Sequence, residues 1–131
     1  MTRVNPDQAY RDAPPQPAEL GEVMRGLAEW IEGKLTPAGV REHKLRAAAA
    51  ADRSALLAAD EVTHYKGQRT AAAREVRALV GETRESAEEA AAALIEHDRQ
   101  HRTALAEPAG LTGRDYVRAE YLAWQTKENA R

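Results

Sequence analysis

Apolar residues recur every three or four positions near the start of the chain, and the set comprises Leu20, Val23, Met24, Leu27, Trp30, Ile31 and Leu35. This spacing places them on one face of an α-helix. Pro17 suits a first helical turn, and Glu19 and Glu22 carry negative charge at the positive end of the helix dipole. The pattern predicts an amphipathic helix over residues 17–35, which the Thr36-Pro37 pair ends because the residue before proline leaves the α region.

The following stretch, residues 38–106, contains no proline and is rich in Ala, Arg, Glu and Leu, the strongest helix formers. Two segments could interrupt a helix of this length. One is Gly67, which suits a helix C-terminus and is followed by Thr70 as a new N-cap. The other is residues 81–86, where Gly81 could end a helix and Ser86 lies three residues before Glu89, the spacing of a capping box.

A repeat of small, apolar and polar residues crosses the second of these segments. Its members recur by fours and threes, the rhythm of a coiled coil. We call this set the seam, and its candidate interface residues are Val76, Val80, Ala87, Leu94, Asp98, His101 and Leu105. Because a break near Ser86 would disrupt the register, the pattern favours one continuous helix over residues 70–106 and a break near Gly67.

Asp98 and His101 occupy seam positions where apolar residues are expected. Polar residues at such positions often set register or oligomeric state, and a His beside a carboxylate could make the interface sensitive to pH. The alternative is that the seam simply ends before Pro108. The sequence leaves both interpretations open.

A last helix is predicted over residues 113–128, after Pro108 to Gly110 have ended the long helix and with Thr112 as its cap. Its apolar and aromatic residues gather mainly on one face. They either dock onto the long helix or bind a protein partner. The candidate partner-binding residues are Tyr116, Val117, Tyr121 and Trp124.

The first 16 residues carry Pro6, Pro14 and Pro15 among small and polar residues. This composition predicts a flexible arm with no helix and nothing to bury. Residues 17–131 then form a single helical domain. The expected fold is all-α, a helical hairpin or small bundle with one long coiled-coil-like helix that can break near Gly67 or Gly81.

The composition restricts the classes of function. Alanine fills 28 of the 131 positions and phenylalanine none, so the core is thin and suits close-packed helices or an elongated oligomer rather than an enzyme with a deep pocket. The net charge of -2 disfavours general nucleic-acid binding, and the absence of cysteine excludes disulfides and thiolate metal sites. No apolar run approaches the length of a membrane span, and we expect a cytoplasmic protein.

Histidine on helices provides the one pattern typical of a metal site. Asp98 and His101 repeat the spacing of Glu61 and His64, and His97 lies four residues before His101. Di-iron helical bundles use acidic residues and histidines at this spacing, but they also need glutamates from two further helices. We therefore expect no metal and no cofactor, and keep a di-metal, ferritin-like protein as an alternative.

No phosphate-binding glycine loop and no nucleophile elbow occurs in the sequence, so we expect no enzyme activity. A helix-turn-helix would need a short glycine turn, which residues 110–113 could supply before Arg114 and Arg118. A DNA-associated regulator that uses this C-terminal helix is therefore another alternative, although nucleic-acid binding is not the main expectation.

The preferred hypothesis is a non-catalytic helical interaction or assembly protein. It would self-associate as a homo-oligomer through the seam. A long helix must bury its apolar side chains against another helix of the chain or against another copy. A phage-type assembly or scaffolding component and a bacterial adaptor both fit this hypothesis. A protein partner could also bind the C-terminal aromatic helix.

Overall fold

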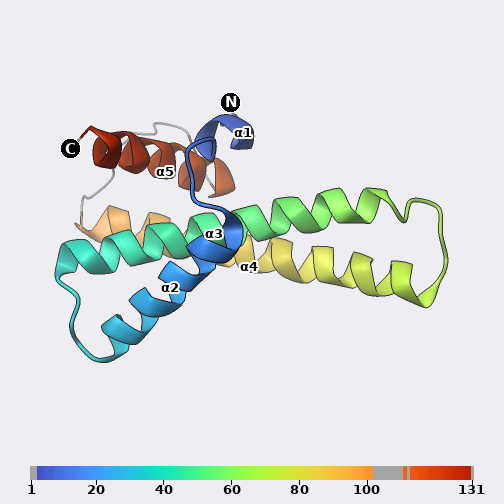
Figure 1. The fold of residues 1–131 in the computed structure, drawn as a ribbon, viewed down its shortest axis with the longest axis horizontal. Coiled ribbons are helices and arrows are strands. Elements are labelled where there is room, and N and C mark those ends of the chain that lie inside the picture. The colour runs from blue at the N-terminus through green and yellow to red at the C-terminus, as the bar shows by residue number, and fades with distance from the viewer. Residues whose placement is uncertain (1–2, 102–110, 112, 131) are drawn as a thin grey trace.

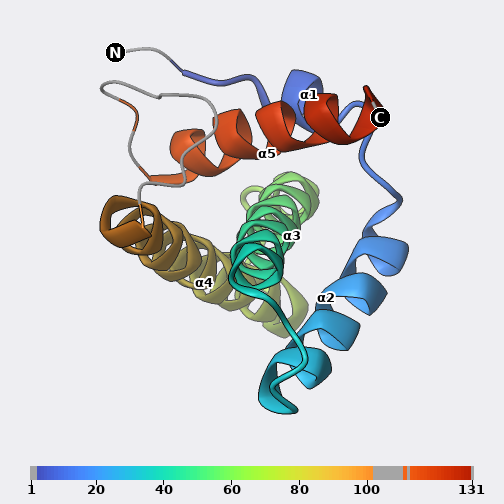
Figure 2. The same ribbon diagram turned by 90° about the vertical axis from the view of Figure 1, so that its left-hand side faces the viewer.

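The computed structural model describes residues 3–101, 111 and 113–130, and these residues form five α-helices and no strand. The helices are α1 (Pro6–Ala9), α2 (Gln16–Ile31), α3 (Pro37–Thr63), α4 (Ala71–His101) and α5 (Gly113–Asn129). α3 and α4 form an antiparallel hairpin, α2 crosses α3 on one side, and α5 crosses the hairpin on another (Figure 1 and Figure 2). The predicted all-α fold is confirmed.

The N-terminal residues contact the rest of the chain, and the prediction that they have no helix and nothing to bury is wrong for residues 3–16. Asn5 caps α1 by accepting a hydrogen bond from the N–H of Asp7 at 2.9 Å, and Pro6 occupies the first turn, which tolerates proline. Ala9 is 2% exposed, and the ring of Tyr10 packs edge-on against a buried tyrosine of α5 at 5.3 Å. This short proline-rich segment therefore packs against α5, with its one helical turn capped by Asn5.

α2 ends earlier than the apolar pattern predicts. Its last residue is Ile31 instead of residue 35, because Gly33 adopts a left-handed backbone with a φ of 71°. The N–H of Gly33 donates to the carbonyl of Trp30 at 2.9 Å, as in the usual glycine end of a helix. Leu35 consequently lies beyond the helix.

The α3–α4 hairpin begins and turns where the sequence predicts. Thr36 caps α3, since its hydroxyl accepts from the N–H of Gly39 at 3.1 Å. The turn contains Gly67 with a φ of 79°, a conformation that glycine adopts at little cost. Thr70 then accepts from the N–H of Ala73 at 3.1 Å. The predicted break near Gly67 is confirmed.

α4 continues without interruption through Gly81 and Ser86. The predicted continuity of the seam is thus confirmed as far as His101. Its extension over residues 102–106, the end at Pro108 and the cap at Thr112 lie outside the described residues.

Alanines form the contact between α3 and α4 near their turn. Ala55 and Ala58 of α3 and Ala73 of α4 are buried there, and small side chains let helix axes lie close together. This part of the hairpin extends beyond the other helices (Figure 1).

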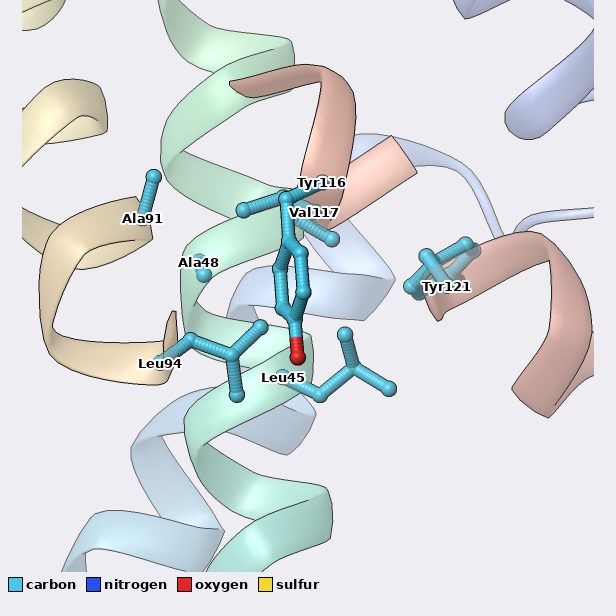
Figure 3. Close-up of a cluster of buried hydrophobic side chains, with 8 residues drawn as sticks. Leu45, Ala48, Ala91, Leu94, Tyr116, Val117 and Tyr121 are labelled. Carbon is cyan, nitrogen blue, oxygen red and sulfur yellow. The ribbon is translucent and has the colours of Figure 1, made fainter. Parts of the chain in front are cut away.

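The main core lies where α5 crosses the hairpin. Figure 3 shows the ring of Tyr116 between Leu45 of α3 and Leu94 of α4, with Val117 and Tyr121 close by. Ala48 and Ala49 of α3 and Ala91 of α4 belong to the same cluster. The predicted docking of the C-terminal helix onto the long helix is confirmed.

Candidate functional site

The structure places most of the seam against α3 of the same chain. Ala87 and Leu94 are 1% and 0% exposed, Asp98 is buried, and Val76 and Val80 are half-buried. Side chains that α3 covers cannot also contact a second copy. The buried residues of the seam therefore form a contact within one chain in this structure.

The C-terminal aromatic helix is also used within the chain. Tyr116, Val117 and Tyr121 are buried, and Trp124 is half-buried with the guanidinium of Arg46 over its ring at 5.4 Å. Three of the four predicted partner-binding residues are therefore covered by α3 and α4. The apolar face of α5 is a core face, because it meets the leucines of the hairpin.

Charged residues from three helices meet beside this core, and we call Arg41, Asp98, Tyr116 and Glu120 the Asp98 cluster. Arg41 donates from Nε and Nη2 to the two oxygens of Asp98 at 3.0 and 2.7 Å, and from Nη2 to Glu120 at 2.6 Å. The Tyr116 hydroxyl donates to Asp98 at 2.7 Å. Asp98 thus links α4 to α3 and α5 inside one chain. The seam therefore continues as a buried contact as far as Asp98.

The protonation states of the Asp98 cluster follow from its contacts. Burial alone would lower the pKa of Arg41, but the hydrogen bonds and charges of Asp98 and Glu120 outweigh burial and raise this pKa. The pKa of Tyr116 is raised, first by burial and then by the hydrogen bond and charge of Asp98. Arg41 therefore stays charged and Tyr116 stays neutral near neutral pH.

A second cluster joins the N-terminal segment, α3 and α5, and we call Asp52, Tyr10, Arg114 and Arg118 the Asp52 cluster. The carboxylate of Asp52 is fully buried. It accepts from Arg118 Nε and Nη2 at 2.8 and 3.0 Å, from Arg114 Nε, and from the Tyr10 hydroxyl at 2.6 Å. Burial would raise the pKa of Asp52, but the hydrogen bonds from Arg118, Tyr10 and Arg114 hold it below its usual value.

The Asp52 cluster engages both arginines on which the DNA-binding alternative rested. The side chains of Arg114 and Arg118 are only 18% and 13% exposed, and both guanidinium groups bind one carboxylate. A phosphate contact by either side chain would have to break this pairing. The geometry of α5 therefore gives the DNA-binding alternative no support.

The histidines of the di-metal hypothesis lie far apart in the chain or already contact other groups of the protein. His97 Nδ1 lies 3.3 Å from Asp98, and His101 Nδ1 lies 2.8 Å from the carbonyl of His97, with the two rings stacked. His101 is exposed, His64 follows the end of α3, and the last seam residue, Leu105, lies outside the described residues. The described residues contain no group of three or more His, Asp or Glu placed to hold a metal ion.

The stability of the fold should fall at alkaline pH because of a buried tyrosine. Burial and then the charge of Glu19 raise the pKa of Tyr121 from 10.0 to about 12, and its hydroxyl has no hydrogen-bond partner among the described residues. A raised folded pKa stabilises the protein below pH 10, and this contribution is lost as the pH rises toward 12. Between these pH values, the free energy of unfolding of the Tyr121→Phe variant should therefore fall by about 2 kcal/mol less than that of the wild type. Urea unfolding followed by circular dichroism measures both changes. Equal losses in both proteins would contradict the assignment.

Among the residues that the structure describes, a group of large apolar side chains on α2 remains uncovered. We call Leu20, Met24, Leu27 and Ile31 the apolar stripe. Their exposed fractions are 43%, 64%, 38% and 77%, although the sequence pattern assigns them to the best amphipathic face of the chain. α2 packs on α3 through the neighbouring face instead, where Glu19 is buried and paired with Arg46 at 2.9 Å.

The surroundings of the apolar stripe extend its apolar character. Trp30 is 40% exposed, lies beside the ring of His43, and has the ammonium group of Lys44 over its ring at 4.6 Å. A hollow of about 150 Å³ separates Trp30 from Ala90 and Ala93 of α4. Apolar surface therefore continues from α2 across α3 to α4.

A signal for the apolar stripe was present in the sequence. The spacings from residue 20 to 24, 27 and 31 are four, three and four, which is the core rhythm of a coiled coil. Val23 and Trp30 follow the same broad apolar pattern, so the narrower repeat of the stripe does not stand out in the sequence. Periodicity also shows which residues share a face without showing what covers it.

No helix in the described part of the chain combines the length and apolar character that crossing a membrane requires. No protein-family model, no curated protein and no solved structure shows significant similarity to this chain.

Proposed function

We propose that this protein is a helical assembly protein whose copies pair through the apolar stripe of α2. The observation that carries the proposal is the exposure of Leu20, Met24, Leu27 and Ile31 on one helix. Contiguous exposed apolar side chains of this kind are typical of interaction sites. The proposal keeps self-association as the function and moves it from the seam to the stripe.

The spacing of the stripe favours another helix as its occupant. Side chains that recur by four, three and four insert into the holes of a facing helix with the same repeat. A second copy of α2 supplies this repeat. In an antiparallel pair, Leu20 faces Ile31 of the other copy and Met24 faces Leu27, so all four side chains find an apolar neighbour.

The charges and the small residues around the stripe also fit a second copy. Arg25 is paired with Glu22 at 3.2 Å, and Glu32 is paired with Lys34 at 2.6 Å, so these flanking charges do not require a charged partner. Gly21 adjoins the stripe, and a Cβ at this position would meet nothing within 4 Å. A facing helix can therefore approach closely beside it.

The shape of the molecule supports an antiparallel orientation. The N-terminal end of α2 lies near α1 and α5, and its C-terminal end lies far from them (Figure 2). A parallel pair would bring both α1–α5 regions to the same end of the pair, whereas an antiparallel pair separates them. Burial of eight stripe side chains contributes on the order of 10 kcal/mol, against an association cost of about 4–15 kcal/mol. The proposal therefore predicts a weak dimer.

Light scattering of the full chain at concentrations up to about 1 mM tests this proposal. The wild type should approach twice 14.4 kDa as concentration rises. The Met24→Glu variant should stay at 14.4 kDa, because a dimer would bury the new carboxylate. Leu79→Glu is the matched control, since Leu79 is 50% exposed on α4, and it should dimerise like the wild type.

Two outcomes would contradict the proposal. A wild type that remains monomeric at every concentration would exclude self-association, and an equal loss of dimer in both variants would place the interface elsewhere. Circular dichroism should show the same helix content in all three proteins, because both substituted side chains are exposed.

A further inference from the structure

A hollow of about 510 Å³ is lined by residues of α1, by Gln16 at the start of α2 and by residues of α3. Its apolar wall consists of Pro6, Tyr10, Leu56 and Leu57, and Leu57 is 59% exposed. A volume of this size falls in the range of small-molecule sites. The hollow is separate from the apolar stripe, the Asp98 cluster and the seam.

Arg53 lines this hollow and differs from the other half-buried arginines. Arg46, Arg114 and Arg118 each bind a carboxylate, whereas Arg53 forms no ion pair with any described residue. Its guanidinium lies 5.7 Å from the ring of Tyr10, and its Nη1 is buried with no hydrogen-bond acceptor among the described residues. A buried donor without an acceptor is costly, and no carboxylate of the described residues neutralises this guanidinium.

Gln16 lines the same hollow and is held in place by its amide nitrogen. Nε2 donates to the carbonyl of Ala50 at 2.8 Å and to the hydroxyl of Ser54 at 3.0 Å. Its Oε1 is buried and has no hydrogen-bond donor among the described residues. The hollow thus combines a guanidinium without an ion-pair partner and an apolar wall, and the Gln16 oxygen, which is an acceptor, offers no bond to an anion.

We infer that this hollow binds a small organic carboxylate that carries an apolar chain. The guanidinium of Arg53 can donate two parallel hydrogen bonds to a carboxylate, and the chain would cover Leu56 and Leu57. Asp7 also lines the hollow, and its negative charge disfavours multiply charged anions such as inorganic phosphate. This inference does not depend on the proposed pairing of α2.

A titration followed by amide NMR shifts tests the inference with probes that separate charge from apolar character. Octanoate carries both features, acetate carries only the carboxylate, 1-octanol carries only the chain, and inorganic phosphate carries only anionic charge. Octanoate should bind at the hollow with a dissociation constant in the millimolar range or below, as its about ten non-hydrogen atoms allow. The other three probes should bind at least tenfold more weakly. Shifts should centre on Gln16, Arg53 and Leu57.

Two variants and a control complete the test. Arg53→Gln should weaken octanoate binding at least tenfold, and Leu57→Ser should also weaken it without affecting the fold, because Leu57 is exposed. Arg84→Gln, a charge change at an exposed residue of α4, should leave the affinity unchanged. Octanoate shifts that centre on the α2 stripe, equal binding of octanol and octanoate, or unchanged binding by Arg53→Gln would each overturn the inference.

Discussion

Replacing Arg41 by methionine is expected to lower the free energy of unfolding by about 3–5 kcal/mol. Arg41 is 7% exposed, and its guanidinium neutralises Asp98 and Glu120 at the crossing of three helices. Methionine retains most of the apolar stem of the side chain but removes the charge. The two carboxylates would then stay in a site from which water is largely excluded, and this arrangement is costly. Urea unfolding at pH 7, followed by circular dichroism, measures the loss.

Arg99→Met is the matched control for this prediction. Arg99 also pairs with a carboxylate, that of Glu96 at 2.6 Å, but both side chains are largely exposed at 73% and 50%. Exposed pairs contribute little, so this variant should change stability far less than Arg41→Met. Similar losses from Arg41→Met and Arg99→Met would contradict the assigned role of the Asp98 cluster.

A triple variant separates charge from packing. Adding Asp98→Asn and Glu120→Gln to Arg41→Met removes the two carboxylate charges beside the substituted position while keeping similar side-chain volumes. Replacing a whole buried ion cluster costs much less than breaking it. The triple variant should therefore be more stable than Arg41→Met alone, whereas a further loss would show that packing dominates the effect.

The second large effect is expected from Asp52→Asn, which should cost about 3 kcal/mol at pH 7. The substitution leaves the guanidinium groups of Arg114 and Arg118 without their carboxylate and weakens the acceptor for Tyr10. Because the cluster joins the N-terminal segment to α5, hydrogen exchange should also speed up in α1. Asp60→Asn is the control, since Asp60 is exposed on the same helix and should have little effect.

The cost of Asp52→Asn should depend on pH with a definite sign. The folded pKa of Asp52 lies below its usual value, so the carboxylate stabilises the fold above about pH 3.9 and loses this contribution as the pH falls through the folded pKa. The difference in unfolding free energy between wild type and variant should shrink at the acidic end. A difference that stays constant down to that range would contradict the charge-based explanation.

Local sequence signals were sufficient for the helical architecture. The break at Gly67, the cap at Thr36 and the uninterrupted helix through Ser86 all depend on residues close to each other in the chain. Where a local signal was missed, as at Gly33, a helix boundary was misplaced by a few residues. Capping and glycine geometry are short-range effects, so the residue types near a helix end can reveal them.

Long-range pairing was beyond reach from a single sequence. Asp52 interrupts the apolar pattern of α3, yet it is fully buried because Arg114 and Arg118 of a distant helix neutralise it. Asp98 is similar, since its partner Arg41 lies on another helix. Charged residues in a helical sequence are usually assigned to solvent, and only the tertiary arrangement shows which of them meet in the core.

Cysteine cross-linking can test whether two copies pair antiparallel through the α2 stripe. The chain has no cysteine, so single cysteines can be placed at will. If the Leu20→Cys and Ile31→Cys proteins are mixed and oxidised, antiparallel pairing predicts a disulfide-linked dimer in the mixture. Either protein alone should form little of this dimer. Cross-linking within each separate protein would indicate a parallel pair, and no cross-linked species in any sample would show that the stripe does not bind a second copy.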